Sequence, residues 1–402
     1  MIQQISHIYS SKKEVFFQKV QLYGLLLLPW ALLFSEAFSS ILVICISIPV
    51  LIFKDHISPK EVWKKYWPYF SIYFLLFVSG FWSADTERWL SLLRVNLPYL
   101  VMPVAFSIWP SFLEKHSSKI LRQFIWAGAF LSVYIFFLVL SGAGADLGEG
   151  GYLPVPVHHV RTSLFLTVAV IAGWNQLILS KKRERVLYFG MVLLLLTGIH
   201  LLAVRTGIIL VYISSVLLFF IHPDFRSGQR WIGIGMMLMV FVVIYLGAPT
   251  LSEKLKYWKE DWQNFDSYSW MHYSDAMRWK TNEIGWEIFL DHPLFGVGMG
   301  DVREEMTLQI LQRENLYTEH YPHNFWITIM AGSGVVGFLI VNIALLVLGV
   351  QMWRAGPVWI VLYLVFLGSC LVETTLLSSL GVICFVFTTL LPGMSRPATL
   401  SE

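Results

Sequence analysis

The chain has 402 residues, of which 56% are hydrophobic and 14% are charged, whereas an ordinary soluble domain carries about 25% charged residues. This composition excludes a water-soluble globular enzyme. The formal net charge of +3 is uninformative until the basic residues are mapped to the two sides of a membrane.

The apolar residues fall in about twelve long stretches. A bilayer core is about 30 Å thick and is crossed by roughly 20 helical residues. The candidate spans lie near residues 20–34, 38–53, 66–82, 89–109, 120–141, 158–179, 186–203, 205–221, 231–247, 324–350, 356–372 and 376–391. We therefore predict an all-α polytopic membrane protein with about 12 transmembrane helices. The three cysteines lie inside apolar blocks, so neither a disulfide framework nor a thiolate metal cluster is expected.

The distribution of basic residues predicts the orientation of these helices. With both termini in the cytoplasm, most of the 29 Lys and Arg residues fall in inner segments, whereas the short outer connections and helix ends carry four arginines and no lysine: Arg88, Arg94, Arg161 and Arg205. This asymmetry is typical of membrane proteins. Residues 1–247 then form nine transmembrane helices, residues 248–322 an outer cap loop, and residues 323–402 three further helices.

The cap loop, residues 248–322, is the one long hydrophilic stretch. It holds thirteen acidic and seven basic residues, and five tryptophans: Trp258, Trp262, Trp270, Trp279 and Trp286. Long loops cross the membrane largely regardless of charge, and this stretch is too aromatic for a disordered linker. We expect a small, mostly helical, folded cap on the outer face.

The outer arginines are candidates for binding an anion, because a charge near membrane depth is costly and is usually kept for function. Arg205 opens an apolar helix, whose N-terminus favours phosphate; alternatively, it anchors the helix end by snorkelling. Arg161 could form a second wall of the same site, or pair with Asp146 or Glu149 in the preceding loop. Ordinary interfacial or inter-helix pairing is the better interpretation for the other two, Arg88 and Arg94.

Arg278 is a further candidate within the cap. It lies on a stretch with apolar residues at helical spacing that residues 291–293 (Asp-His-Pro) should end, and three glycines then predict a turn. The helix would present Arg278 toward the membrane. The alternative is a solvated ion pair with Asp275 or Glu283, which is typically weak at a surface.

His323 lies where the cap returns to the bilayer, and we predict that it is a catalytic base. A histidine titrates in the range suited to accepting a proton near neutral pH, although a lone interfacial histidine is more often structural. Asn324 could orient this histidine or a sugar hydroxyl, and Glu373, at the outer end of the eleventh span, could contact a cation or a sugar hydroxyl. The glycines that follow in the tenth span predict close helix packing: Gly332, Gly334 and Gly337.

Metal binding is not favoured. His320 and His323 are three residues apart, but Pro322 disturbs any helix between them and no third ligand has a diagnostic spacing. The acidic residues at positions 301, 304 and 305 are better interpreted as a solvated face.

The motifs described above, taken in order around one large outer loop, resemble those of the O-antigen ligase and Wzy-type polymerase superfamily. They are Arg205-Thr206-Gly207, Arg278 followed by residues 291–298, and His323-Asn324 with its downstream glycines. The resemblance covers about residues 200–340 in motifs and the whole chain in topology.

This resemblance implies a GT-C-like glycosyltransferase of the bacterial inner membrane, active in lipopolysaccharide biosynthesis. As an O-antigen ligase, it would transfer a glycan from undecaprenyl pyrophosphate to the lipid A-core oligosaccharide at the periplasmic face, with inversion and without a metal or other cofactor. The family arginines that match Arg205 and Arg278 bind pyrophosphate, and the histidine that matches His323 activates the acceptor hydroxyl. Arg161 fits a less regular family arginine. Membrane lipids are the other expected partners, and nucleic acid is not.

Other functions remain open at this point. The same donor could serve a repeat-unit polymerase or a protein O-oligosaccharyltransferase, which the sequence separates poorly from a ligase. A transporter for a lipid-linked glycan would also place arginines in a membrane cavity. This sequence concentrates its outer arginines and His323 at one interface and leaves the midplane nearly free of charge, which favours an enzyme.

Overall fold

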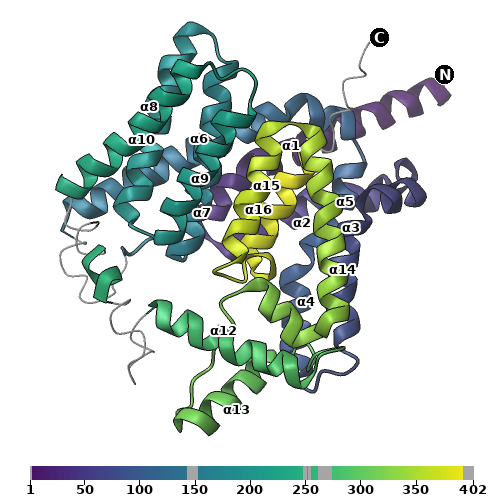
Figure 1. The fold of residues 1–402 in the computed structure, drawn as a ribbon. Coiled ribbons are helices and arrows are strands. Elements are labelled where there is room, and N and C mark those ends of the chain that lie inside the picture. Colours follow the sequence, from purple (N-terminus) through teal and green to yellow (C-terminus); the bar gives the residue numbers. More distant parts are fainter. Residues whose placement is uncertain (1, 143–152, 248–250, 252–254, 261–273, 393–402) are drawn as a thin grey trace.

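The computed structural model describes residues 2–142, 153–247, 251, 255–260 and 274–392, and within these ranges all regular structure is helical. The elements are α1 (Ile2–Phe34), α2 (Glu36–Ile52), η1 (Lys54–His56), α3 (Pro59–Ser79), α4 (Thr86–Asn96), α5 (Pro98–Ser107), α6 (Pro110–Leu140), α7 (His159–Leu179), α8 (Lys182–Leu202), α9 (Arg205–Ile221), α10 (Ser227–Gly247), α12 (Ser274–Asp291), α13 (Val302–Glu314), α14 (Phe325–Ala355), α15 (Pro357–Cys370), η3 (Thr375–Leu377) and α16 (Ser379–Leu390). The all-α class is thus confirmed (Figure 1).

Each of the twelve apolar stretches coincides with one or two of these helices. Seven helical segments are long and apolar enough to cross a membrane: Lys12–Phe34, Thr86–Ser107, Lys115–Leu140, His159–Leu179, Lys182–Leu202, Ser227–Gly247 and Phe325–Ala355. Four further apolar helices are shorter: Glu36–Ile52, Arg205–Ile221, Pro357–Cys370 and Ser379–Leu390. A polytopic membrane protein is therefore supported, and the number of twelve spans stays a prediction.

Local sequence signals explain where several helices begin. Proline occupies the start of four of them, α3, α5, α6 and α15, where its missing N–H costs no helical hydrogen bond. Asp85 caps α4 by accepting from the Arg88 amide, and Asn324 caps α14 by accepting from the Trp326 and Ile327 amides. These caps fix the chain direction at two connections that border the candidate site.

The helices α12 and α13 lie together at one end of the bundle, opposite the end where α1 begins (Figure 1). They share a small apolar core with Ala331 of α14, formed by Ala276, Ile284, Ile288, Val302, Met306 and Ile310. Of the five cap tryptophans, Trp262 and Trp270 lie outside the described residues. Which side of the membrane this end faces stays a prediction.

Asp301 differs from the expected solvated acidic face. Its two carboxylate oxygens accept hydrogen bonds from the Ala84 and Asp85 amides, each at 2.7 Å. The carboxylate thus ties the start of α13 to the connection between α3 and α4. The sequence could not show this contact, because the partners are more than 200 residues apart.

The helix α14 is broken at Gly334, where φ is +63°. The segment after α12 runs along this break: Val297 N donates to Ala331 O, and Val335 N donates to Pro293 O, both at 2.9 Å. Close packing, as predicted, holds at Gly332 and Gly337, where an added Cβ would lie within 3.0 Å of a side-chain atom. At Gly334 the requirement is different, since only glycine adopts this φ readily, and the break joins the cap to the bundle.

Candidate active site

The residues selected from the sequence meet at the end of the bundle that carries α12 and α13. Arg205 begins α9, Arg161 lies in the first turn of α7, and Arg278 lies on α12. His323 precedes the cap of α14, and Glu373 lies between α15 and η3. Helix ends that are far apart in the sequence therefore supply one site.

Two of the arginines share one carboxylate. Asp275 Oδ2 pairs with Arg205 Nη1, and its Oδ1 lies 3.2 Å from Arg278 Nη1. Arg205 also donates to Ser274 Oγ at 2.9 Å, and its guanidinium lies 5.1 Å from the centroid of the Trp258 ring. The predicted alternative partner of Arg278 is thus present, but it is not a solvated surface pair. It holds two guanidinium groups side by side, an arrangement suited to binding an anion.

Glu373 connects the second arginine to the histidine. Its Oε1 lies 3.8 Å from Arg278 Nη2 and 3.8 Å from His323 Nδ1. Burial would raise the pKa of Glu373, but His323, Arg278 and His158 together lower it, and the net direction is downward. The carboxylate is therefore ionised near neutral pH, and the cations that it contacts belong to the protein.

The imidazole of His323 turns Nδ1 toward Glu373, which leaves Nε2 as the ring nitrogen that can accept a proton from a substrate. Asn324 supports this arrangement from the backbone side. Besides capping α14, its Nδ2 donates to Leu371 O at 3.1 Å. Asn324 therefore holds the start of α14 against the end of α15, and so His323 near Glu373. A direct contact between Asn324 and a sugar stays a prediction.

Arg161 pairs with Glu36 of α2, with Nη1 and Oε1 2.6 Å apart. The partners considered from the sequence, Asp146 and Glu149, lie outside the described residues. Arg161 also lines a cavity of about 140 Å³ together with His158, Thr206 and Glu373. Thr206 in turn borders a smaller neighbouring cavity that contains Arg205 and Arg278. The three predicted arginines thus border two adjacent cavities.

The cavity of about 140 Å³ contains groups that shift the pKa of His158 in opposite directions. Burial lowers the pKa of His158, Glu373 opposes this shift, and Arg161, Arg278 and His323 lower the pKa further. His158 therefore favours its neutral form near neutral pH. His158 and His159 lie shortly before Arg161 in the sequence, but the sequence gave no reason to assign either of them to the site.

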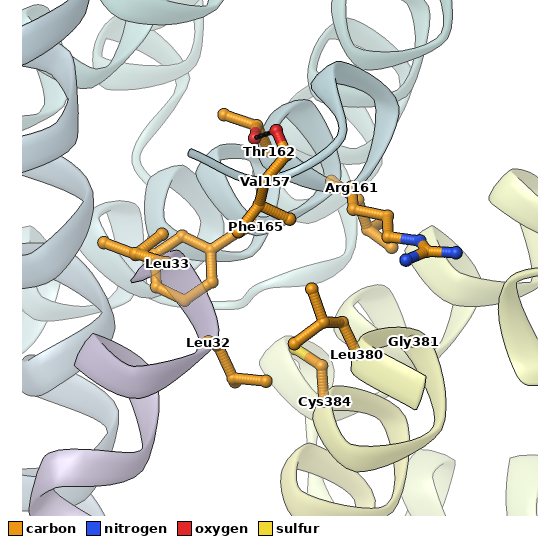
Figure 2. Close-up of a pocket in the computed structure, with 10 residues that line it drawn as sticks. Leu32, Leu33, Val157, Arg161, Thr162, Phe165, Leu380, Gly381 and Cys384 are labelled. Carbon is orange, nitrogen blue, oxygen red and sulfur yellow. Dashed lines mark hydrogen bonds between the residues drawn. The ribbon is translucent and has the colours of Figure 1, made fainter. Parts of the chain in front are cut away.

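An apolar cavity adjoins Arg161 on its other side. Figure 2 shows side chains of α1, α7 and α16 around it, with the Arg161 guanidinium at its margin. Its apolar lining includes Leu32, Leu33, Phe165 and Leu380. Arg161 therefore borders both the polar cavity of about 140 Å³ and a small apolar cavity of about 20 Å³.

The remaining outer arginines fit the simpler interpretation of the sequence. Arg88 Nε lies 3.1 Å from Asp85 Oδ2, and Arg88 Nη2 lies 3.4 Å from Glu319 Oε2. Arg94 is exposed on α4. His320, considered as a metal ligand with His323, contacts the Thr318 hydroxyl at 3.0 Å.

Asp275 is the main functional candidate that sequence reasoning missed. Its position three residues before Arg278 predicted a local pair, but nothing in the sequence indicated that Arg205, 70 residues away, would share the same carboxylate.

A comparison with known protein families gives a match over part of the chain. Residues 189–342 match the family model described as O-antigen ligase, and none of the curated proteins matches the sequence. The matched segment contains Arg205, Arg278, His323 and the first part of α14, including its break at Gly334. It ends before Glu373, and it begins after Arg161. The match covers less than half of the chain and confirms its resemblance to the O-antigen ligase and Wzy superfamily.

Proposed function

We propose that the protein transfers a glycan from undecaprenyl pyrophosphate to the lipid A-core oligosaccharide at the periplasmic face of the inner membrane. The observation that supports this most directly is the chain of contacts from Arg205 through Asp275, Arg278 and Glu373 to His323. In this chain of contacts, two arginines of the kind that an anion would require lie next to a histidine that contacts a carboxylate.

The pyrophosphate of the donor binds between Arg205 and Arg278 and takes the place of Asp275. Pyrophosphate offers more oxygens and more charge than one carboxylate, and arginine binds such groups through two donors at once. Arg278 Nε is buried and has no hydrogen-bond acceptor among the described residues. A buried unpaired donor is costly, and a phosphate oxygen would satisfy it after a small rearrangement.

The reaction is a single displacement at the anomeric carbon of the donor sugar. His323 Nε2 removes the proton of the acceptor hydroxyl while the oxygen attacks, and the new C–O bond forms as the bond to the phosphate oxygen breaks. Undecaprenyl pyrophosphate leaves with the electron pair, and the arginines neutralise its developing charge. Attack opposite to the leaving group inverts the configuration. Glu373 stabilises the positive charge that His323 acquires.

The test is the surface-glycan profile of a deletion strain, separated into lipopolysaccharide-attached and carrier-linked pools. The strain is complemented with wild type, His323→Ala or the control His116→Ala. His116 is matched in residue type, and its ring nitrogen contacts the Phe112 carbonyl within α6. We expect wild type and His116→Ala to restore long chains on lipopolysaccharide, and His323→Ala to leave them on the carrier.

Each other outcome contradicts a defined part of the proposal. Lipopolysaccharide that keeps a single repeat unit in the deletion strain would indicate a polymerase. Loss of glycans from proteins alone would indicate a protein O-oligosaccharyltransferase. Full activity of His323→Ala would exclude His323 as the base, and an unchanged profile in the deletion strain would exclude both the ligase and the polymerase for that polymer.

A further inference from the structure

A larger cavity lies next to the cavity of about 140 Å³ that Arg161 and Glu373 line; these two are the second and the first cavity, respectively. The second cavity has a volume of about 270 Å³ and is bordered by α4, α13, the start of α14 and η3. Its lining residues include Arg88, Arg303, Tyr321, Thr328 and Thr374. Thr374 also lines the cavity of Arg161 and Glu373. The two cavities therefore meet at the connection between α15 and η3.

The arginines of the second cavity are balanced by carboxylates. Glu319 pairs with both arginines: its Oε2 lies 3.4 Å from Arg88 Nη2 and also contacts Arg303 Nη2. Asp85 provides a second carboxylate to Arg88 at 3.1 Å. The two guanidinium groups are thus held in place and carry no excess positive charge into the cavity, as binding of an uncharged ligand requires.

The polar groups that line the second cavity suit sugar hydroxyls. The Arg88 and Arg303 guanidinium groups donate hydrogen bonds, and the Thr328 and Thr374 hydroxyl oxygens can accept them, so neighbouring hydroxyls of a sugar ring find partners of both kinds. Burial raises the pKa of the Tyr321 phenol, while Arg88 and Arg303 lower it, and the net direction is upward. Tyr321 thus keeps its hydroxyl proton and can donate it.

These side chains are accessible to a ligand. Arg88, Arg303 and Glu319 are 32%, 31% and 36% exposed, respectively. The same ion-pair chemistry occurs once more on the cap helices, where Arg313 pairs with Glu287 at exposures of 37% and 36%. Neither Arg313 nor Glu287 lines the cavity, whereas Arg303 does, so the Arg313–Glu287 pair provides a matched control.

The cavity also borders the segment that carries His323. The Thr328 hydroxyl, on the cavity wall, donates to Asn324 O at 2.9 Å and to Pro322 O at 3.3 Å. An inverting displacement requires the attacking hydroxyl and the leaving pyrophosphate to approach the anomeric carbon from opposite faces. Both cavities border neighbours of this base: Glu373, which contacts His323, lines the first, and Thr328, which bonds to the Pro322 and Asn324 carbonyls, lines the second.

We propose that the second cavity is the acceptor subsite, and that Arg88 and Arg303, held in place by Glu319, bind an uncharged, hydroxyl-rich sugar ring of the acceptor glycan. This inference rests on the proposed glycosyltransferase function. It adds the side from which the acceptor enters and the residues that bind and position it, which lie outside the donor site.

The test is the steady-state kinetics of transfer in proteoliposomes, with undecaprenyl-pyrophosphate-linked glycan as donor and lipopolysaccharide lacking O-chains as acceptor. Glu319→Gln keeps the size of the side chain and removes its charge, and Arg303→Lys is a second conservative change. We expect each to raise the acceptor KM roughly 10- to 100-fold, as for loss of a hydrogen bond to a charged group, with the donor KM unchanged. The control Glu287→Gln should leave both KM values unchanged.

The outcomes separate this inference from the proposed function. If wild type transfers glycan but Glu319→Gln and Arg303→Lys keep the wild-type acceptor KM, the acceptor subsite is wrong and the enzyme function stands. An increase in the donor KM instead would assign the cavity to the donor and also overturn the inference. If wild type transfers nothing to this acceptor, the ligase proposal is wrong and the inference falls with it.

Discussion

The contact between Glu373 and His323 predicts a specific pattern of catalytic losses. In the proposed reaction His323 accepts the proton of the attacking hydroxyl, and its ring would become positively charged 3.8 Å from the Glu373 carboxylate. Glu373→Gln removes that charge and keeps the shape of the side chain. We expect the variant to bind donor and acceptor but to transfer glycan more slowly, because the interaction strengthens only as the proton moves.

The magnitude follows from the distance and the exposure. Two unit charges near 4 Å apart interact by about 1 kcal/mol in water and about 4 kcal/mol at an effective dielectric constant of roughly 20. Both side chains are about one quarter exposed, and Arg278 lies equally close to the same oxygen. The expected loss is therefore about 1 to 3 kcal/mol, or roughly 5- to 150-fold in rate.

The assay is a double-mutant cycle on single-turnover transfer rates in proteoliposomes. His323→Ala should lower the rate by roughly 10² to 10⁴, as for the loss of a general base. Because Glu373 acts through the charge on His323, adding Glu373→Gln to His323→Ala should change the rate by less than about twofold. Losses that multiply, or a larger loss from Glu373→Gln than from His323→Ala, would refute this role and assign Glu373 to the substrate or to Arg278.

Three further predictions concern stability, each measured by thermal unfolding in detergent micelles. Gly334→Ala should cost at least about 1 to 2 kcal/mol, because its φ of +63° disfavours any side chain, whereas Gly190→Ala, with open space around the Cβ, should not destabilise; equal effects would contradict the helix break. Asn324→Ala should cost about 1 kcal/mol through loss of the helix cap, and an unchanged melting temperature would exclude this. Glu373 has a lowered pKa in the folded protein, so it stabilises the fold above its usual pKa of 4.5. The difference between wild type and Glu373→Gln should therefore be lost as the pH falls below about 4.5, where the Glu373 carboxylate becomes protonated, and a difference that persists in strong acid would contradict it.

The helices could be predicted from the sequence because their cause is local. An apolar stretch of about 20 residues has to satisfy its backbone groups internally in a bilayer, and a helix does this without help from distant residues. The break in α14 has a different cause. The stretch around Gly334 is as apolar as an ordinary span, and the break becomes visible only when the segment that includes Pro293 and Val297 pairs with it.

The candidate site was predictable to the extent that chemistry and topology determine it. A cationic residue at a membrane interface is costly, so Arg161 and Arg205 stood out, and the alternating helix directions brought them to one end. Arg278 was a candidate for another reason, its place on a helical stretch of the cap. The partners of these arginines could not be predicted. Glu36 lies 125 residues from Arg161, and Asp275 was expected to meet Arg278 alone. These pairings depend on how the helices are rotated and offset, which the sequence pattern leaves open.

The pairing of every site arginine with an acid has a consequence for ligand choice. An arginine near the membrane must be paired to avoid the cost of an uncompensated charge, and Glu36 and Asp275 provide this in the described residues for Arg161, Arg205 and Arg278. A ligand therefore has to compete with a carboxylate that is already in place. A carboxylate or a monophosphate of similar size gains little by the exchange, whereas a pyrophosphate can contact both guanidinium groups with separate phosphates. The resting ion pairs would thus select a diphosphate by the number of contacts it makes rather than by charge alone.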